Sequence, residues 1–168
     1  MPVSPSPPPW PDDACLGAGL PPAAERALAL AGQHYDEPQR ALAWLEQARR
    51  EAPGHYAVDI GLYRLHFYQG RLEEALAVAE DCLARAVHAL GMPGDWRALT
   101  PASAVFSDYA PLPRFVLFGL KAYAYLQLRR GRRAEGEEAL AKLAQLDPGD
   151  CLKGSVLRAV LAPETDDD

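Results

Sequence analysis

An internal repeat is the feature of this 168-residue chain that most constrains its fold. A shift of 34 positions superposes Leu28 on Leu62, Ala41 on Ala75, Leu42 on Leu76, Ala43 on Ala77, Glu46 on Glu80 and Ala52 on Ala86. A further shift of 61 positions places Gly131 on Gly70 and Gly136 on Ala75. Units of this length cannot bury their apolar face alone, so neighbouring units must stack. The sequence therefore predicts an array of similar units.

Composition shows that the repeated units are helical. The chain contains 30 Ala and 24 Leu but only 8 Val, 1 Ile and 2 Thr. Ala and Leu lose little rotamer freedom in a helix, whereas β-branched side chains are restricted by the preceding turn. Apolar spacing and the Pro and Gly breaks predict an all-α fold, with helices over residues 23–34, 38–51, 55–69, 71–90, 114–130, 132–146 and 150–161.

Small residues occupy the positions at which two helices of one unit would cross. Ala41, Ala75 and Gly136 are equivalent under the two shifts, and larger side chains there would separate the helices. With the 34-residue period and Gly70 closing a helix, this pattern resembles the tetratricopeptide repeat (TPR) family, most clearly over residues 57–83. The resemblance implies about three divergent repeats of antiparallel helical hairpins, stacked in a right-handed solenoid.

A C-terminal capping helix is expected to cover the last hairpin. Asp150 is predicted to cap its N-terminus, and Leu152, Val156 and Val160 are predicted to share its apolar face.

The expected organisation is a Pro-rich, disordered tail over residues 1–22, one helical domain over 23–162 and an acidic tail over 163–168. An insertion at 91–113 interrupts the period of the domain, and Thr100 is predicted to begin one helical turn within it. Two interpretations of Trp96, Phe106 and Tyr109 stay open. They fill the space left by a missing helix pair, or they belong to a segment that lines a groove or moves when a partner binds.

Charge and composition exclude several classes of protein. The net charge of −6 argues against a nucleic-acid binder, although four acids lie in 164–168 and the rest of the chain is at −2. No apolar run approaches the roughly 20 residues of a membrane span, and the N-terminus lacks the pattern of a signal peptide. With 3 scattered cysteines, these features predict a cytoplasmic protein. Its 14 Arg against 3 Lys suggest a bacterial source.

Residues that could perform chemistry do not converge in the sequence. There is no phosphate loop, nucleophile elbow or dinucleotide fingerprint, and His34, His55, His66 and His88 lack metal-ligand spacing. Adjacent acids such as Glu73 and Glu74 point in different directions on a helix. We therefore expect no enzyme activity, no cofactor and no metal.

By alignment to the family, cations and aromatic residues fall on the inner face of the stack. The candidate groove residues are Arg26, Arg64, Phe67, Tyr68, Lys121, Tyr125 and Arg129. Arginine pairs with carboxylates and aromatic rings supply apolar contact, so the predicted partner is a protein or peptide with acidic and apolar residues. The predicted function is a protein-binding adaptor or dedicated chaperone. A self-associating structural protein, present as a homodimer, is the alternative, and a small enzyme or cofactor-binding protein is a remote one.

Overall fold

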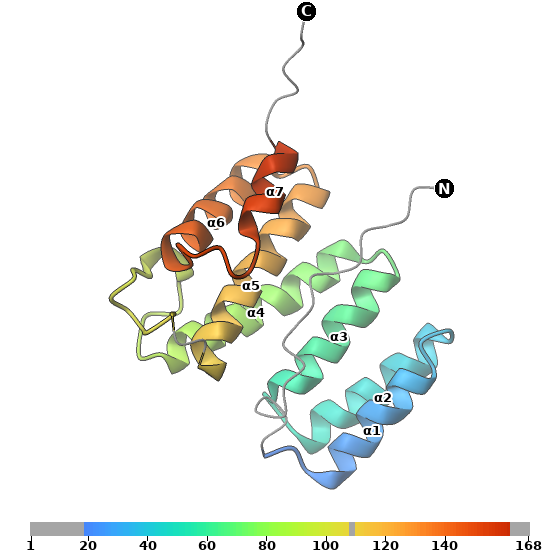
Figure 1. Cartoon of the computed structure of the whole chain (residues 1–168). Helices are drawn as coiled ribbons and strands as arrows, with labels where there is room; N and C mark the ends of the chain where they lie inside the picture. The colour runs from blue at the N-terminus through green and yellow to red at the C-terminus, as the bar shows by residue number, and fades with distance from the viewer. Residues whose placement is uncertain (1–18, 108–109, 162–168) are drawn as a thin grey trace, which may run out of the picture. The chain divides into compact units, whose positions relative to one another are not determined.

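Seven α-helices and one 3-10 helix account for the regular structure of residues 19–107 and 110–161, the part of the chain that the computed structural model describes. In chain order they are α1 (Pro22–Gln33), α2 (Pro38–Glu51), α3 (Tyr56–Tyr68), α4 (Leu72–Ala89), η1 (Trp96–Ala98), α5 (Pro111–Arg129), α6 (Arg133–Leu146) and α7 (Gly154–Leu161) (Figure 1). These ranges contain no strand, so the all-α prediction is confirmed. The predicted tail over residues 1–22 lies largely outside the described residues.

Contacts between residues divide the chain into two compact units. Unit 1 extends to Cys82 and unit 2 begins at Leu83, so the boundary falls within α4. The single domain over 23–162 and the stacking of all hairpins into one right-handed solenoid stay predictions.

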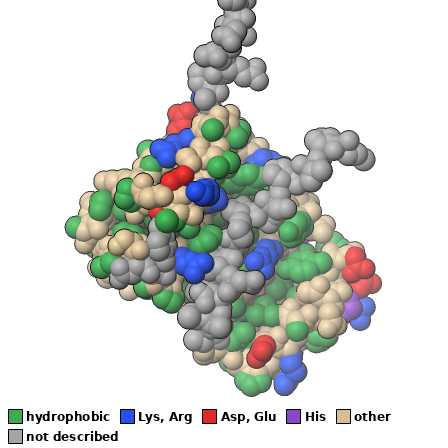
Figure 2. Space-filling view, in the orientation of Figure 1, with side chains coloured by type: hydrophobic (Ala, Val, Ile, Leu, Met, Phe, Trp, Pro, Cys, Tyr) green, Lys and Arg blue, Asp and Glu red, His purple; other side chains and the backbone are tan. Residues whose placement is uncertain are grey.

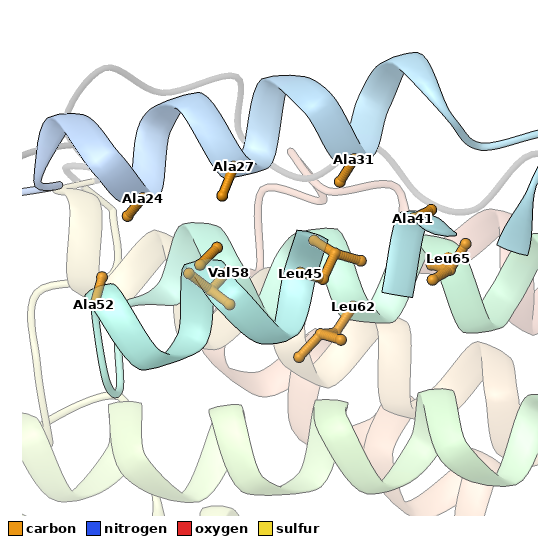
Figure 3. Packing of buried hydrophobic residues seen from close by; sticks show 10 residues of the cluster. Ala24, Ala27, Ala31, Ala41, Leu45, Ala52, Val58, Leu62 and Leu65 are labelled. Atoms are coloured by element: carbon orange, nitrogen blue, oxygen red, sulfur yellow. The ribbon is translucent and has the colours of Figure 1, made fainter. Parts of the chain in front are cut away.

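Alanine dominates the core of unit 1. Ala24, Ala27 and Ala31 lie at the α1 face that contacts α2, and each is at most 1% exposed. Figure 3 shows these side chains directed towards the neighbouring helices, where Leu45 and Leu62 fill the space between them. A methyl side chain permits close helix approach without losing the favourable helix propensity of the residue. Close packing of α1 against α2 therefore depends on these alanines.

Gly61 is a further small residue beside this core, which sequence reasoning missed. A Cβ atom at Gly61 would lie 2.8 Å from Leu45 Cδ2. The glycine thus allows the side chain of Leu45 to lie against the backbone of α3.

Two helix ends confirm the 61-residue shift at the level of backbone geometry. Gly70 and Gly131 both have positive φ, +70° and +76°. After α3, Arg71 N–H donates to His66 O at 2.9 Å, and after α5, Arg132 N–H donates to Gln127 O at 2.8 Å. This is the Schellman arrangement, which satisfies orphan carbonyls and favours glycine at the left-handed position. The same residue type therefore ends the first helix of both hairpins for the same reason.

The centre of unit 2 is a hairpin of α5 and α6. Phe115, Leu117, Leu120, Leu126, Leu140 and Leu143 are almost completely buried. Gly136 lies where α6 approaches α5, because a Cβ there would be 2.8 Å from Leu128 Cγ and 3.3 Å from Ala124 O. Although α5 has 19 residues, no helix in the described ranges combines the length and apolarity needed to cross a bilayer.

The start of α5 differs from the prediction. The helix begins at Pro111, whereas the sequence predicted a start at 114 and assigned Pro111 and Pro113 to the insertion. Proline is tolerated in the first helical turn because its missing N–H would have no helical partner there. The two prolines therefore begin α5 instead of ending a loop.

The last helix also differs from the prediction. It begins at Gly154, and Asp150 lies before it with φ of +53°. The Asp150 carboxylate still accepts a hydrogen bond from Ser155 N–H at 3.1 Å. Because Leu152 precedes the helix, it does not share a helical face with Val156 and Val160. Leu152 is buried, but Val156 and Val160 are 59% and 78% exposed, so the prediction of one buried face was wrong.

Candidate functional site

In unit 1, an aromatic cluster joins the end of α3 to the turn after α1. The ring of Tyr68 lies 6.0 Å from Phe67 and 6.5 Å from Tyr35, edge-on in both cases. Tyr68 is 61% exposed, whereas Phe67 is 8% exposed. Phe67 therefore supports the cluster from the interior, and Tyr68 presents it to solvent.

Arg64 lies beside this cluster, one helical turn before Tyr68 on α3. Burial raises the pKa of Tyr35, and the positive charge of Arg64 opposes that increase. The Arg64 side chain is half-buried. A partner carboxylate that approached Arg64 would meet aromatic edges next to it.

Tyr35 was not predicted as a site residue. It lies two residues after the end of α1, where helical periodicity no longer predicts the direction of a side chain. Arg26 was predicted but lies exposed near the other end of α1, nine positions before Tyr35 in the sequence. That separation is about 13 Å along a helix, so Arg26 is not part of the cluster.

In unit 2, the predicted residues follow one face of α5. Lys121, Tyr125 and Arg129 are spaced four residues apart. Arg129 Nη1 donates to Tyr125 Oη at 3.1 Å, and the Arg129 guanidinium carbon lies 5.9 Å from the ring centroid. Burial lowers the pKa of half-buried Lys121, while the negative charge of Asp150 opposes the shift. This face combines two cations with one aromatic ring.

The insertion is attached to the α5–α6 hairpin by its side chains. Trp96 is 6% exposed, its ring lies 5.6 Å from that of Tyr123, and Arg97 lies 4.4 Å above it. Arg97 pairs with Glu138, and Lys142 Nζ donates to Leu99 O at 2.6 Å. These contacts support the interpretation that the insertion fills space beside the hairpin.

The rest of the insertion is also partly buried. Phe106 is 4% exposed, and Tyr109 lies outside the described residues. A cleft of about 490 Å³ separates residues 101–107 from the C-terminal end of α6. The short helix of this segment begins at Trp96, where Asp95 accepts a hydrogen bond from Arg97 N–H at 3.0 Å. Thr100 begins a tight turn, in which Ser103 N–H donates to Thr100 O at 2.9 Å, and residues 100–107 contain no helix, so the helical turn predicted at Thr100 was wrong.

His66 is an unusual titratable group in unit 1. Its Nδ1 is buried and has no hydrogen-bond partner among the described residues. Burial lowers its pKa from the usual 6.5, although Glu74 and Glu46 oppose the shift. The structure therefore favours the neutral imidazole.

We expect the burial of His66 to make the free energy of unfolding depend on pH. Below about pH 6.5 the unfolded chain binds a proton at His66, while the folded chain binds it only at lower pH, so the free energy of unfolding falls as the pH falls. His66→Gln removes this contribution. Urea denaturation of both proteins between pH 5 and about pH 8 should show a wild-type loss that exceeds the loss in the variant. Parallel curves would contradict the assignment.

No group of three or more His, Cys, Asp or Glu side chains that could hold a metal occurs within 19–107 and 110–161. The aromatic cluster beside Arg64 lies in unit 1, and the α5 face with Tyr125 and Arg129 lies in unit 2. The single concave groove expected from the sequence stays a prediction, and each surface is a candidate by itself.

Comparisons with known proteins agree with the helical repeat. A tetratricopeptide repeat family model matches residues 35–90. A protein of Azotobacter chroococcum mcd 1, described as an uncharacterized 19.8 kDa protein in the nifW 5′ region, is 36% identical over 120 residues, which cover 70% of this chain and 67% of that protein. No solved structure matches this chain. Together with the hairpins and their equivalent helix ends, the family match shows that residues 35–90 of this chain belong to the tetratricopeptide repeat family.

Proposed function

We propose that this protein is a non-enzymatic, cytoplasmic module that binds acidic and apolar residues of a protein partner, as an adaptor or a dedicated chaperone. The observation that carries the proposal is the same pairing of cation and aromatic ring in both units. In unit 1 the charge of Arg64 acts on Tyr35, whose ring contacts Tyr68, and in unit 2 Arg129 contacts Tyr125. Arg64 and Tyr68 are equivalent to Tyr125 and Arg129 under the 61-residue shift, so the pair recurs with its order reversed.

The chemistry of these surfaces supports an acidic and apolar partner. A guanidinium binds a carboxylate through two parallel hydrogen bonds, and an adjacent ring adds apolar contact at small entropic cost. On the face of the molecule in Figure 2, Lys and Arg side chains lie next to hydrophobic ones.

Charge reversal tests the proposal. We expect Arg64→Glu and Arg129→Glu each to weaken partner binding by about tenfold or more, because the partner carboxylate would meet a like charge. Affinity capture with the tagged full chain, followed by mass spectrometry, measures the loss.

Arg50→Glu is the matched control, because Arg50 is an exposed arginine on α2 that belongs neither to the aromatic cluster of unit 1 nor to the α5 face. It should capture the same proteins as the wild type. If Arg64→Glu and Arg129→Glu both capture the same proteins as the wild type, with circular dichroism unchanged, the proposal that these two surfaces bind the partner is refuted.

One observation favours self-association as a second function. Val156 and Val160 project from α7 into solvent, whereas the terminal helix of a repeat array is expected to have a polar outer face. Light scattering distinguishes the two functions. A concentration-independent monomer that captures a partner supports the adaptor, and a tight dimer lost in Val156→Lys supports self-association.

A further inference from the structure

The turn between α5 and α6 carries the strongest concentration of positive charge in the sequence. Arg129, Arg130, Arg132 and Arg133 surround Gly131, within the segment that ends α5 and begins α6. Arg129, Arg132 and Arg133 are exposed, and Arg130 is half-buried. We name these four residues the arginine turn.

Neighbouring carboxylates neutralise only part of this charge. Arg133 Nε lies 2.8 Å from Glu137 Oε1. Arg132 lies 4.0 Å from Glu135, at the limit of an ion pair, and the hydrogen bond of Arg129 goes to the neutral hydroxyl of Tyr125. The arginine turn can therefore accept further carboxylates at Arg129 and Arg132.

The position of Arg132 and Arg133 strengthens this attraction. Arg132 is the N-cap of α6 and Arg133 is its first residue. The helix macrodipole places partial positive charge at a helix N-terminus, where cations are unfavourable and anions are stabilised. An added carboxylate would relieve that repulsion as well as pair with the guanidinium groups.

The chain itself contains a segment of complementary charge within reach. The helix α7 begins beside α6, since a Cβ at Gly154 would lie 2.9 Å from Leu143 Cδ2. Figure 1 shows α7 running back along α6 towards the end at which α5 and α6 join. Eight residues of α7 cover about 12 Å, and ten residues of α6 separate Leu143 from Arg133 by about 15 Å, so α7 ends near the level of the arginine turn.

Four acids follow α7, beginning three residues after Leu161. They are Glu164, Asp166, Asp167 and Asp168. Five extended residues beyond Leu161 span up to about 17 Å, enough to bring Asp166 to the arginine turn. We propose that the acidic segment 164–168 docks on the arginine turn of its own chain and competes there with the acidic residues of a partner. The competition rests on the proposed function, whereas the contact itself does not.

Zero-length cross-linking tests the contact without any partner. Arg132→Lys keeps the charge and introduces an amine that a carbodiimide can join to a carboxylate. We expect mass spectrometry of the monomer, at low micromolar concentration, to find amide links between 129–133 and 164–168, and about 1 M NaCl should suppress them because the attraction is screened.

Arg114→Lys is the matched control, because it places an amine at the opposite end of α5, about 22 Å from Arg129. It should give no link to 164–168. If the amine at position 132 joins only Glu135 or other acids of α6, the proposed contact is wrong.

Peptide binding tests the competition. The probe is a short fluorescent peptide of Glu, Leu and Phe, and the variant combines Glu164→Gln, Asp166→Asn, Asp167→Asn and Asp168→Asn. A tethered competitor has an effective concentration near 1 mM, so against an intrinsic dissociation constant of about 0.1 mM its removal should tighten probe binding about tenfold. Equal affinity of both proteins would overturn the competition. A cross-link without probe binding to either protein would leave the contact established and refute the proposed function for this surface.

Discussion

Replacing Trp96 with alanine is expected to lower the free energy of unfolding by about 3–5 kcal/mol. The indole is 6% exposed, contacts the ring of Tyr123 and carries the guanidinium of Arg97 on its face. Truncation leaves a cavity and removes the surface on which Arg97 lies, so both packing and the attachment of the insertion to Glu138 are weakened. Urea denaturation monitored by circular dichroism measures the loss.

Val105→Ala is the control for this prediction. Val105 belongs to the same insertion but is 59% exposed, so its truncation should change stability by no more than about 0.5 kcal/mol. Deletion of residues 95–110 extends the test to the whole insertion. If Trp96→Ala and the deletion both leave stability unchanged while partner capture is lost, the insertion acts in binding and not in the core.

A leucine at Gly136 is expected to destabilise unit 2 by about 3 kcal/mol, at the upper end of the range for overpacked cores. Its Cβ would be 2.8 Å from Leu128 Cγ, and the backbone oxygen of Ala124, 3.3 Å away, leaves little room for the side chain to move. The α5–α6 hairpin would have to separate or bend. Thermal and urea denaturation should both show the loss.

Gly32→Ala is the opposite control. Gly32 lies in α1, and no atom lies within 4 Å of the position that its Cβ would occupy. Alanine there should increase stability by about 0.5–1 kcal/mol, because it favours the helix and creates no contact. If Gly136→Leu were as stable as the wild type, the close crossing of α5 and α6 at this residue would be wrong.

The helices could be predicted because each depends on local sequence. The spacing of Ala and Leu and the breaks at Gly70, Gly131 and Pro38 identify α1 to α6 to within three residues. Glycine at positive φ ends a helix through its own backbone freedom, and proline begins one through its fixed φ, so neither requires knowledge of distant residues. Errors arose where a local signal was ambiguous, as at Pro111, which both ends loops and begins helices.

The candidate surfaces were only partly predictable. Periodicity placed Lys121, Tyr125 and Arg129 on one face of α5, because residues four apart lie on the same side of a helix. Tyr35 was missed because it lies in a turn, where direction depends on the neighbouring helix. The exposure of Val156 and Val160 was missed because α7 begins at Gly154, after Leu152. The first hydrogen bonds of the helix, such as the one from Val156 N–H to Lys153 O, determine where it begins.

The sequence alone determined that this chain forms helical hairpins, where α1 to α6 lie to within three residues, and that small residues lie at their crossings. These properties follow from helix propensity, backbone freedom and the period of the repeat, all of which act over a few residues. Only the tertiary structure decided that Trp96 and Phe106 are buried, that Phe67 supports Tyr68, and that α7 exposes its valines. Burial depends on which elements contact one another, and residues far apart in the sequence decide that.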